Sequence, residues 1–94
     1  MKSVNLYIMD KRILSLREEI DVIDEKIITL LKSRMDVSKK VGKLKAALHI
    51  PVEDKSREEE IIQRLGELAN GHLKEKQLIR IFTAVFKSSR QIQK

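Results

Sequence analysis

The chain has no cysteine, which excludes a disulfide framework, a thiolate zinc site and a thiol nucleophile and favours a reducing compartment such as the cytoplasm. Glycine occurs three times and proline once in 94 residues, too rarely for the turns of a sheet protein. Aromatic side chains make up only 3%, too few for the stacking surfaces of single-strand nucleic-acid binders. No apolar run reaches membrane-spanning length. We therefore expect an all-α protein that neither spans a membrane nor stacks nucleobases.

The length and composition are those of one folded domain. Hydrophobic residues make up 41% of the chain and charged residues 36%, which is too apolar for a disordered protein. Residues 1–10 carry no convincing signal peptide. We divide the chain into an N-terminal extension, residues 1–9, and a helical domain, residues 10–94. The formal net charge of +6 predicts an anionic partner, but does not distinguish a polymer from a small molecule.

The first half of the domain has the periodicity of one long helix. Apolar residues recur at alternating steps of three and four, at Ile13, Leu16, Ile20, Ile23, Ile27, Leu30, Val37, Val41, Leu44 and Leu48. We expect this helix to begin near Asp10 and to end at His49 or Ile50, because Pro51 disfavours helical geometry in the residue before it.

Such a helix is too long to be covered by its own chain. About 38 residues span roughly 57 Å, whereas a compact chain of this size has a radius of gyration of only about 12 Å. A second copy of the same helix would bury the apolar stripe most simply. The length therefore predicts a homodimer.

Two shorter helices complete the predicted protomer. Asp54 is a suitable N-cap for the first of them, and Asn70-Gly71 is a suitable end. The second begins at about Lys74. Their predicted inward faces consist of Ile61, Ile62, Leu65 and Leu68 in one helix and Leu78, Ile81, Phe82, Val85 and Phe86 in the other.

Polar residues interrupt these apolar faces at specific positions. Arg34 occupies a core position of the long helix, and Lys45 lies about 20° from it around the helix and about 16 Å along the axis. The face of the last helix that carries Phe86 continues into Ser89 and Gln93. These residues could line a shared polar cavity that binds an anion. Alternatively, Arg34 sets the helix register or reaches solvent, and Ser89 and Gln93 mark a fraying end.

The sequence shows none of the usual machinery for metal, nucleophilic or nucleotide chemistry. His49 and His72 lie at no metal-ligand spacing from another histidine or a carboxylate pair, so we expect no metal site. No serine has a plausible base partner, and no glycine-rich phosphate loop is present.

The residues resemble those of the all-helical chorismate mutase family. The similarity runs from about Leu14 to the C-terminus. Its motifs are Leu16 to Ile20 with Ile23-Asp24, Leu30-Leu31 with Arg34, Val41 to Lys43 with Lys45, Pro51-Val52 with Asp54, Arg57 and Glu58, and Phe82 with Ser89 and Gln93.

The resemblance implies an intertwined homodimer of three-helix protomers that rearranges chorismate to prephenate, without a cofactor, in the shikimate pathway to phenylalanine and tyrosine. Arg34 and the partner's Arg17 would pair with the two carboxylates of chorismate. Lys45 and Gln93 would donate to the ether oxygen as its charge grows. Glu58 and Asp54 would hold the ring hydroxyl, with Ser89 and Arg57 as secondary contacts.

Helix geometry is consistent with Arg17 acting in the partner's site. Arg17 and Arg34 are about 25 Å apart along a straight helix and face about 100° differently, so they cannot hold one small molecule within one chain. An antiparallel dimer could bring them together.

Two other functions stay open. Elimination of pyruvate from isochorismate would need a similar cationic pocket, although the Pro51-Val52-x-Asp54 pattern favours the mutase. A non-enzymatic basic dimer could bind nucleic acid, but its Lys and Arg residues should then line one outer face, whereas they scatter around the long helix among acidic residues.

Overall fold

The computed structural model describes residues 10–94, so the predicted extension, residues 1–9, lies outside the described residues. Three helices make up this part of the chain, α2 (Lys11–Leu48), α3 (Lys55–Ala69) and α4 (Glu75–Gln93), and it contains no strand. The predicted all-α fold with one long helix and two shorter ones is confirmed. None of these helices combines the length and apolar composition needed to cross a bilayer. The described residues divide into two units, residues 10–33 and residues 34–94.

Local hydrogen bonds account for both ends of α2. At the start, Oδ1 of Asp10 accepts a hydrogen bond of 2.8 Å from the backbone N–H of Arg12. At the end, His49 adopts the left-handed conformation, with φ 57°. The N–H groups of His49 and Ile50 donate to the carbonyls of Ala46 and Lys45, at 3.3 and 2.8 Å. This Schellman arrangement satisfies two of the last carbonyls and turns the chain away ahead of Pro51.

Both shorter helices begin, and the first of them ends, where the sequence predicted. Asp54 caps α3, with its Oδ1 accepting from the N–H of Arg57 at 2.9 Å. Asn70 ends the helix in the left-handed conformation, and Gly71 follows with φ 81°. The N–H of Lys74 donates to the side chain of Gln77 at 2.9 Å, which fixes the first turn of α4.

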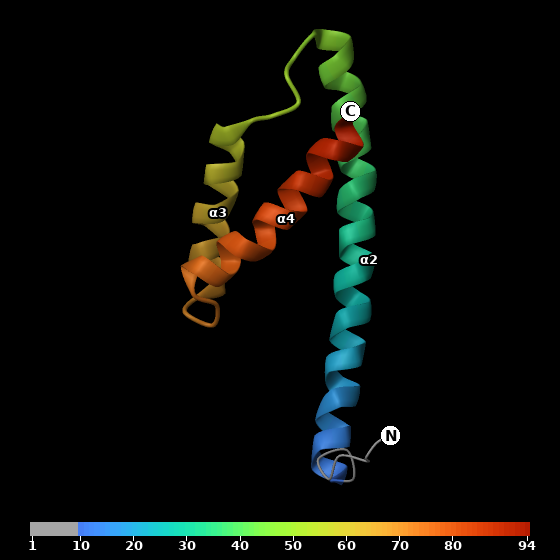
Figure 1. The fold of residues 1–94 in the computed structure, drawn as a ribbon, viewed down its shortest axis with the longest axis vertical. Helices are drawn as coiled ribbons and strands as arrows, with labels where there is room; N and C mark the ends of the chain where they lie inside the picture. The colour runs from blue at the N-terminus through green and yellow to red at the C-terminus, as the bar shows by residue number, and fades with distance from the viewer. Residues whose placement is uncertain (1–9) are drawn as a thin grey trace, which may run out of the picture. The chain divides into compact units, whose positions relative to one another are not determined.

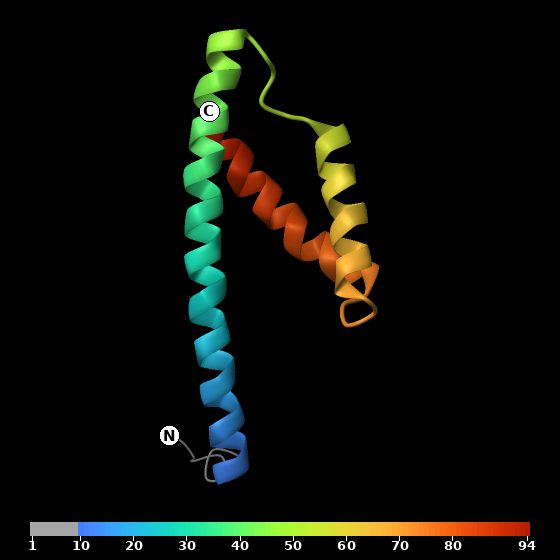
Figure 2. The same cartoon turned by 180° about the vertical axis from the view of Figure 1, so that it is seen from behind.

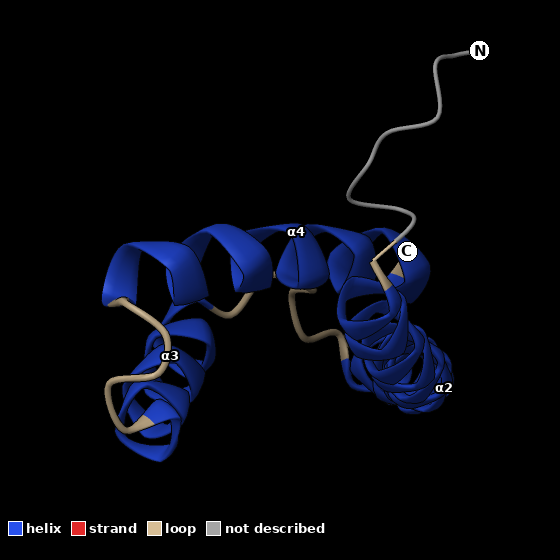
Figure 3. Ribbon diagram, turned by 90° about the horizontal axis from the view of Figure 1, so that it is seen from below, coloured by secondary structure: helices blue, strands red, loops and turns tan. Residues whose placement is uncertain are grey.

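The unit of residues 34–94 has a small apolar core between α3 and α4. Ile61, Leu78 and Phe86 are its buried apolar residues, and the ring of Phe82 packs at a tilt against Phe86, with 5.8 Å between centroids. Figures 1 and 2 show α4 running from the C-terminal end of α3 to the green C-terminal part of α2, and Figure 3 shows the short loop that joins α3 to α4. This course brings the last turn of α4 to residues 34–48 of α2.

Two residues that the sequence placed on inward faces are exposed. Leu68, in the last turn of α3, is 76% exposed, and Ile81 of α4 is 51% exposed. With only two short helices packed together, each helix has one covered side, and residues at its edge or end keep contact with water.

The unit of residues 10–33 has no buried residue among those described. Its apolar stripe is 47% to 69% exposed, at Leu16, Ile20, Ile23, Ile27 and Leu30. Soluble proteins rarely leave so continuous an apolar stripe in water, and such a stripe commonly marks an interface.

Candidate functional site

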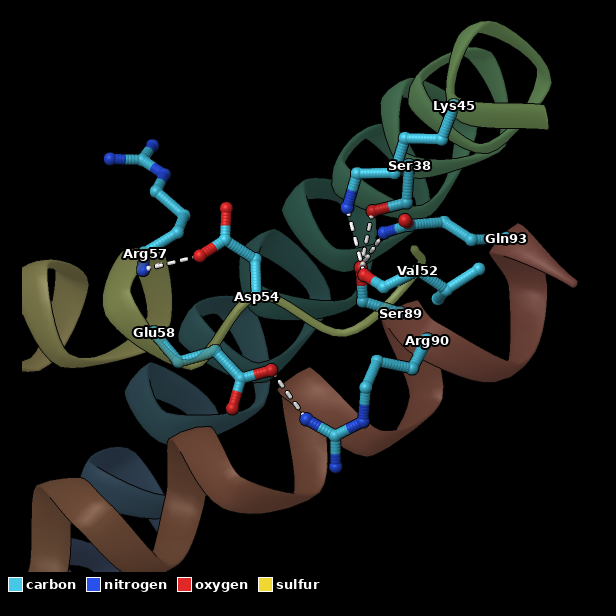
Figure 4. Close-up of polar contacts among 9 residues, drawn as sticks. All are labelled: Ser38, Lys45, Val52, Asp54, Arg57, Glu58, Ser89, Arg90 and Gln93. Carbon is cyan, nitrogen blue, oxygen red and sulfur yellow. Dashed lines mark hydrogen bonds and ion pairs between the residues drawn. The ribbon is translucent and has the colours of Figure 1, made fainter. Parts of the chain in front are cut away.

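A cavity of about 280 Å³ lies where α4 meets residues 34–48 of α2 and the start of α3. Its polar lining comes from all three helices and from the loop before α3. Figure 4 shows Ser38, Lys45, Ser89 and Gln93 converging, and Glu58 turned toward Arg90. The polar lining residues are Arg34, Ser38, Lys45, Asp54, Arg57, Glu58, Ser89, Arg90 and Gln93. The apolar ones are Val37, Val41, Val52, Ile61 and Phe86.

The lining is cationic. It contains four cations (Arg34, Lys45, Arg57 and Arg90) and two carboxylates (Asp54 and Glu58), a formal surplus of two positive charges. A larger cavity of about 830 Å³ between α3 and α4 has the opposite balance, because Glu58, Glu59, Glu67 and Glu75 line it with Lys55 as the one cation. The cationic cavity therefore favours a negatively charged ligand, and the acidic cavity disfavours one.

Arg34 is the least satisfied polar group of the smaller cavity. Its Nη1 is buried and has no hydrogen-bond partner among residues 10–94. The guanidinium lies 5.8 Å from the ring centroid of Phe86. Burial, and then the positive charge of Arg57, lower the pKa of Arg34. A half-buried cation with an unused donor is costly unless it is paired, so this position suits a negatively charged group.

Lys45 reaches across to the loop before α3. It lies in the last turn of α2, and its Nζ donates to the carbonyl oxygen of Val52 at 2.8 Å. An ammonium group has three donors, so this contact orients Lys45 and leaves two N–H groups for a ligand.

A chain of hydrogen bonds holds Gln93. The hydroxyls of Ser38 and Ser89, both buried, lie 2.6 Å apart and share a hydrogen bond between α2 and α4. Gln93 Nε2 donates to Ser89 Oγ over a long 3.4 Å, and Gln93 Oε1 is buried with no partner among residues 10–94. The amide is therefore positioned at the cavity while most of its hydrogen-bonding capacity is unused.

The start of α3 provides the carboxylates. Asp54 caps the helix, and Arg57 forms an ion pair with Glu60 on the exposed side of α3. Glu58 instead forms an ion pair with Arg90 of α4. Residues 10–94 contain no group of three or more side chains placed to hold a metal ion.

A family model described as chorismate mutase type II matches residues 16–94. The chain belongs to this family.

Relatives of the chorismate mutase type II family come from several organisms. A chorismate mutase of Methanocaldococcus jannaschii is 32% identical over 87 residues, which cover 92% of this chain and 88% of that protein. A bifunctional chorismate mutase/prephenate dehydratase of Escherichia coli K12 is 37% identical over 78 residues. Those residues are 82% of this chain and 20% of the relative, so the chain spans about a fifth of that protein. A solved structure of a conserved hypothetical protein from Pyrococcus furiosus matches with a TM-score of 0.74 and 36% identity, over 90% of this chain and 99% of that one.

Within this chorismate mutase type II chain, the structure brings most of the predicted site residues to one cavity. Seven line it: Arg34, Lys45, Asp54, Arg57, Glu58, Ser89 and Gln93. Arg17 is exposed on α2 in the unit of residues 10–33 and is not among the lining residues.

Sequence reasoning missed Ser38 and Arg90, which also line the cavity. Ser38 follows Arg34 by four residues and precedes Lys45 by seven, so helical spacing already placed it on their face. Arg90 lies three residues before Gln93, but nothing in the sequence indicated that Glu58 would be its partner.

Proposed function

We propose that this protein is a chorismate mutase, which rearranges chorismate to prephenate on the route to phenylalanine and tyrosine. The observation that carries the proposal is the unpaired, half-buried Arg34 in a cavity with a surplus of two positive charges, in a chain of this family. Chorismate is a dianion, so its two carboxylates match that surplus.

The reaction needs positioning and charge stabilisation, and it needs no nucleophile. It is unimolecular: the C–O bond of the enolpyruvyl ether breaks while a C–C bond forms within the same molecule. Holding the substrate in the compact reactive conformation removes part of the entropic barrier. Donors aimed at the ether oxygen stabilise the negative charge that develops there as the C–O bond breaks.

The cavity residues divide between these tasks. Arg34 would bind one carboxylate, because its free Nη1 suits a charge-assisted hydrogen bond. Lys45 and Gln93 would donate to the ether oxygen. Glu58, with Asp54 nearby, would accept from the ring hydroxyl, and Ser89 and Arg57 would act as secondary contacts.

We propose further that the active protein is a homodimer in which Arg17 reaches the partner's cavity and binds the second carboxylate. The exposed stripe of residues 10–33 supports this assembly, because pairing two such stripes removes them from water. Residues 10–94 would form the catalytic domain, with residues 1–9 as an extension. The cytoplasmic location stays a prediction that cell fractionation would test.

The direct test is to follow chorismate consumption in the ultraviolet and to identify the product by NMR, with isochorismate as a parallel substrate. We expect prephenate from chorismate and no pyruvate from isochorismate. Pyruvate release without prephenate formation would replace the mutase by the lyase. Turnover of neither substrate would refute both activities.

A further inference from the structure

The ion pair between Arg90 and Glu58 differs from the other ion pairs of the described residues. It joins α4 to α3, across 32 residues of sequence, whereas the Arg12 and Arg57 pairs each link residues within one turn. Its side chains are only 27% and 25% exposed, against 54% and 66% for Arg57 and its partner. Partial burial weakens solvent screening, so this pair can hold its members in place better than a surface pair can.

Glu58 needs such a restraint because its side chain lies between two cavities and could turn toward either. Glu58 lines both the cationic cavity and the larger acidic one. A glutamate side chain has three rotatable bonds, and Lys55 on the acidic side offers an alternative partner. Arg90 donates to Oε2 and so holds the carboxylate on the side of the cationic cavity. Oε1 can then accept a hydrogen bond from a ligand.

Arg90 is also tied to the donors of the site. It directly follows the buried Ser89 and precedes Gln93 by three residues on the last turns of α4. One ion pair thereby couples the position of the carboxylate on α3 to that of the amide on α4 (Figure 4).

We infer that Arg90 is a positioning residue, which holds Glu58 so that its free oxygen meets the ring hydroxyl of the substrate. This inference rests on the proposed function. Arg90 itself need not touch chorismate, because this role requires only the contact between its Nη1 and Glu58.

The test is a double-mutant cycle on the dimeric protein with Arg90→Met, Glu58→Gln and the double variant. Arg90→Met should lower kcat/KM for chorismate about tenfold, and Arg90→Lys should restore part of the loss, since lysine supplies one charged donor. The double variant should be no worse than Glu58→Gln alone. Arg80→Met, which removes an exposed arginine from the same helix, is the matched control and should behave as wild type.

A second readout separates positioning from folding. With a chorismate analogue that lacks the ring hydroxyl, wild type and Arg90→Met should have the same kcat/KM, because the hydroxyl is the group that Glu58 contacts. Equal losses with both substrates, or additive losses in the cycle, would overturn the inference and leave Arg90 a structural role. If wild type turned over chorismate but Arg90→Met matched it, this inference alone would fail. If wild type did not turn over chorismate, the proposed function would fail with it.

Discussion

The backbones of Gly42 and Gln93 touch: a Cβ atom on Gly42 would lie 2.6 Å from Cα of Gln93 and 2.7 Å from its carbonyl oxygen. Real Cβ atoms essentially never approach other atoms so closely. Gly42 is buried in α2, and the absence of its side chain allows the last turn of α4 to reach the cavity. The helix accepts a poor helix former here because any larger residue would displace Gln93.

This contact predicts the outcome of Gly42→Ala. Alanine favours the helix by up to about 1 kcal/mol, but its methyl group must push the backbone of Gln93 away. We expect kcat/KM to fall at least about tenfold, because small displacements of a donor impair catalysis strongly. We also expect thermal stability to fall, because the methyl group clashes with backbone atoms of Gln93, and such overpacking costs about 1–3 kcal/mol, which outweighs the helix gain. Kinetics and circular dichroism melting measure the two effects.

Gly66→Ala is the matched control. The nearest atom to its new methyl group would be Cδ2 of Leu78 at 3.9 Å, an ordinary contact. This variant should gain stability and keep full activity. Wild-type kinetics in Gly42→Ala would show that the Gly42 contact does not set the position of Gln93.

Replacing Arg34 tests whether the cation serves a ligand or the fold. In the wild type, burying a donor without a partner destabilises the fold by about 1–3 kcal/mol, and Arg34→Leu removes this penalty. The same substitution removes a cation–π contact with Phe86 that stabilises the fold by about 1 kcal/mol. The free energy of unfolding should therefore stay equal or rise, while turnover is abolished. Chemical denaturation and the chorismate assay check both, with the exposed Arg64→Leu as control. A marked loss of stability with normal turnover in the folded fraction would point to a structural role.

Gln93→Glu tests donation to the ether oxygen. A carboxyl group donates a hydrogen bond only when it is protonated, so kcat should fall at neutral pH and recover as the pH is lowered. Loss of one such donor typically costs about 3 kcal/mol of transition-state stabilisation. Gln91→Glu places the same charge on the exposed side of that turn and should leave the pH–rate profile unchanged. An unaltered profile in folded, dimeric Gln93→Glu would place Gln93 outside the reaction.

Mixing inactive variants tests the role of Arg17 in the partner's site. Arg17→Ala and Arg34→Ala should each be inactive alone. Unfolded and refolded together, they should regain about a quarter of wild-type activity, because half of the dimers are mixed and each mixed dimer has one intact site. Sedimentation equilibrium on the same samples should give twice 10.9 kDa.

The control for that experiment is a mixture of Arg34→Ala with Lys45→Ala. Both changes fall in the cavity that a single chain forms, so mixed dimers contain no intact site and activity should not return. Recovery in this mixture, or none in the first, would contradict the contribution of Arg17 from the partner.

The sequence alone determined those features that depend on interactions between residues close together in the chain. The cap at Asp54, the turn at Asn70 and the end of α2 before Pro51 follow from bonds that span five residues or fewer. Helical periodicity also placed Arg34 and Lys45 on one face. His49 is an instructive partial failure: the end of α2 was predicted within two residues, but the left-handed conformation that closes it had no signal in a histidine.

The tertiary structure decided the partners of the polar groups. Ser38 and Ser89 are 51 residues apart in sequence, and Glu58 and Arg90 are 32 apart. In sequence, Glu58 follows Arg57 directly and offers no reason to prefer Arg90, because charge attraction is not selective among nearby cations. The packing of α4 against α3 made that selection. Periodicity thus determines which face a residue occupies, whereas only the packing of helices determines which side chains from different faces come within hydrogen-bonding distance.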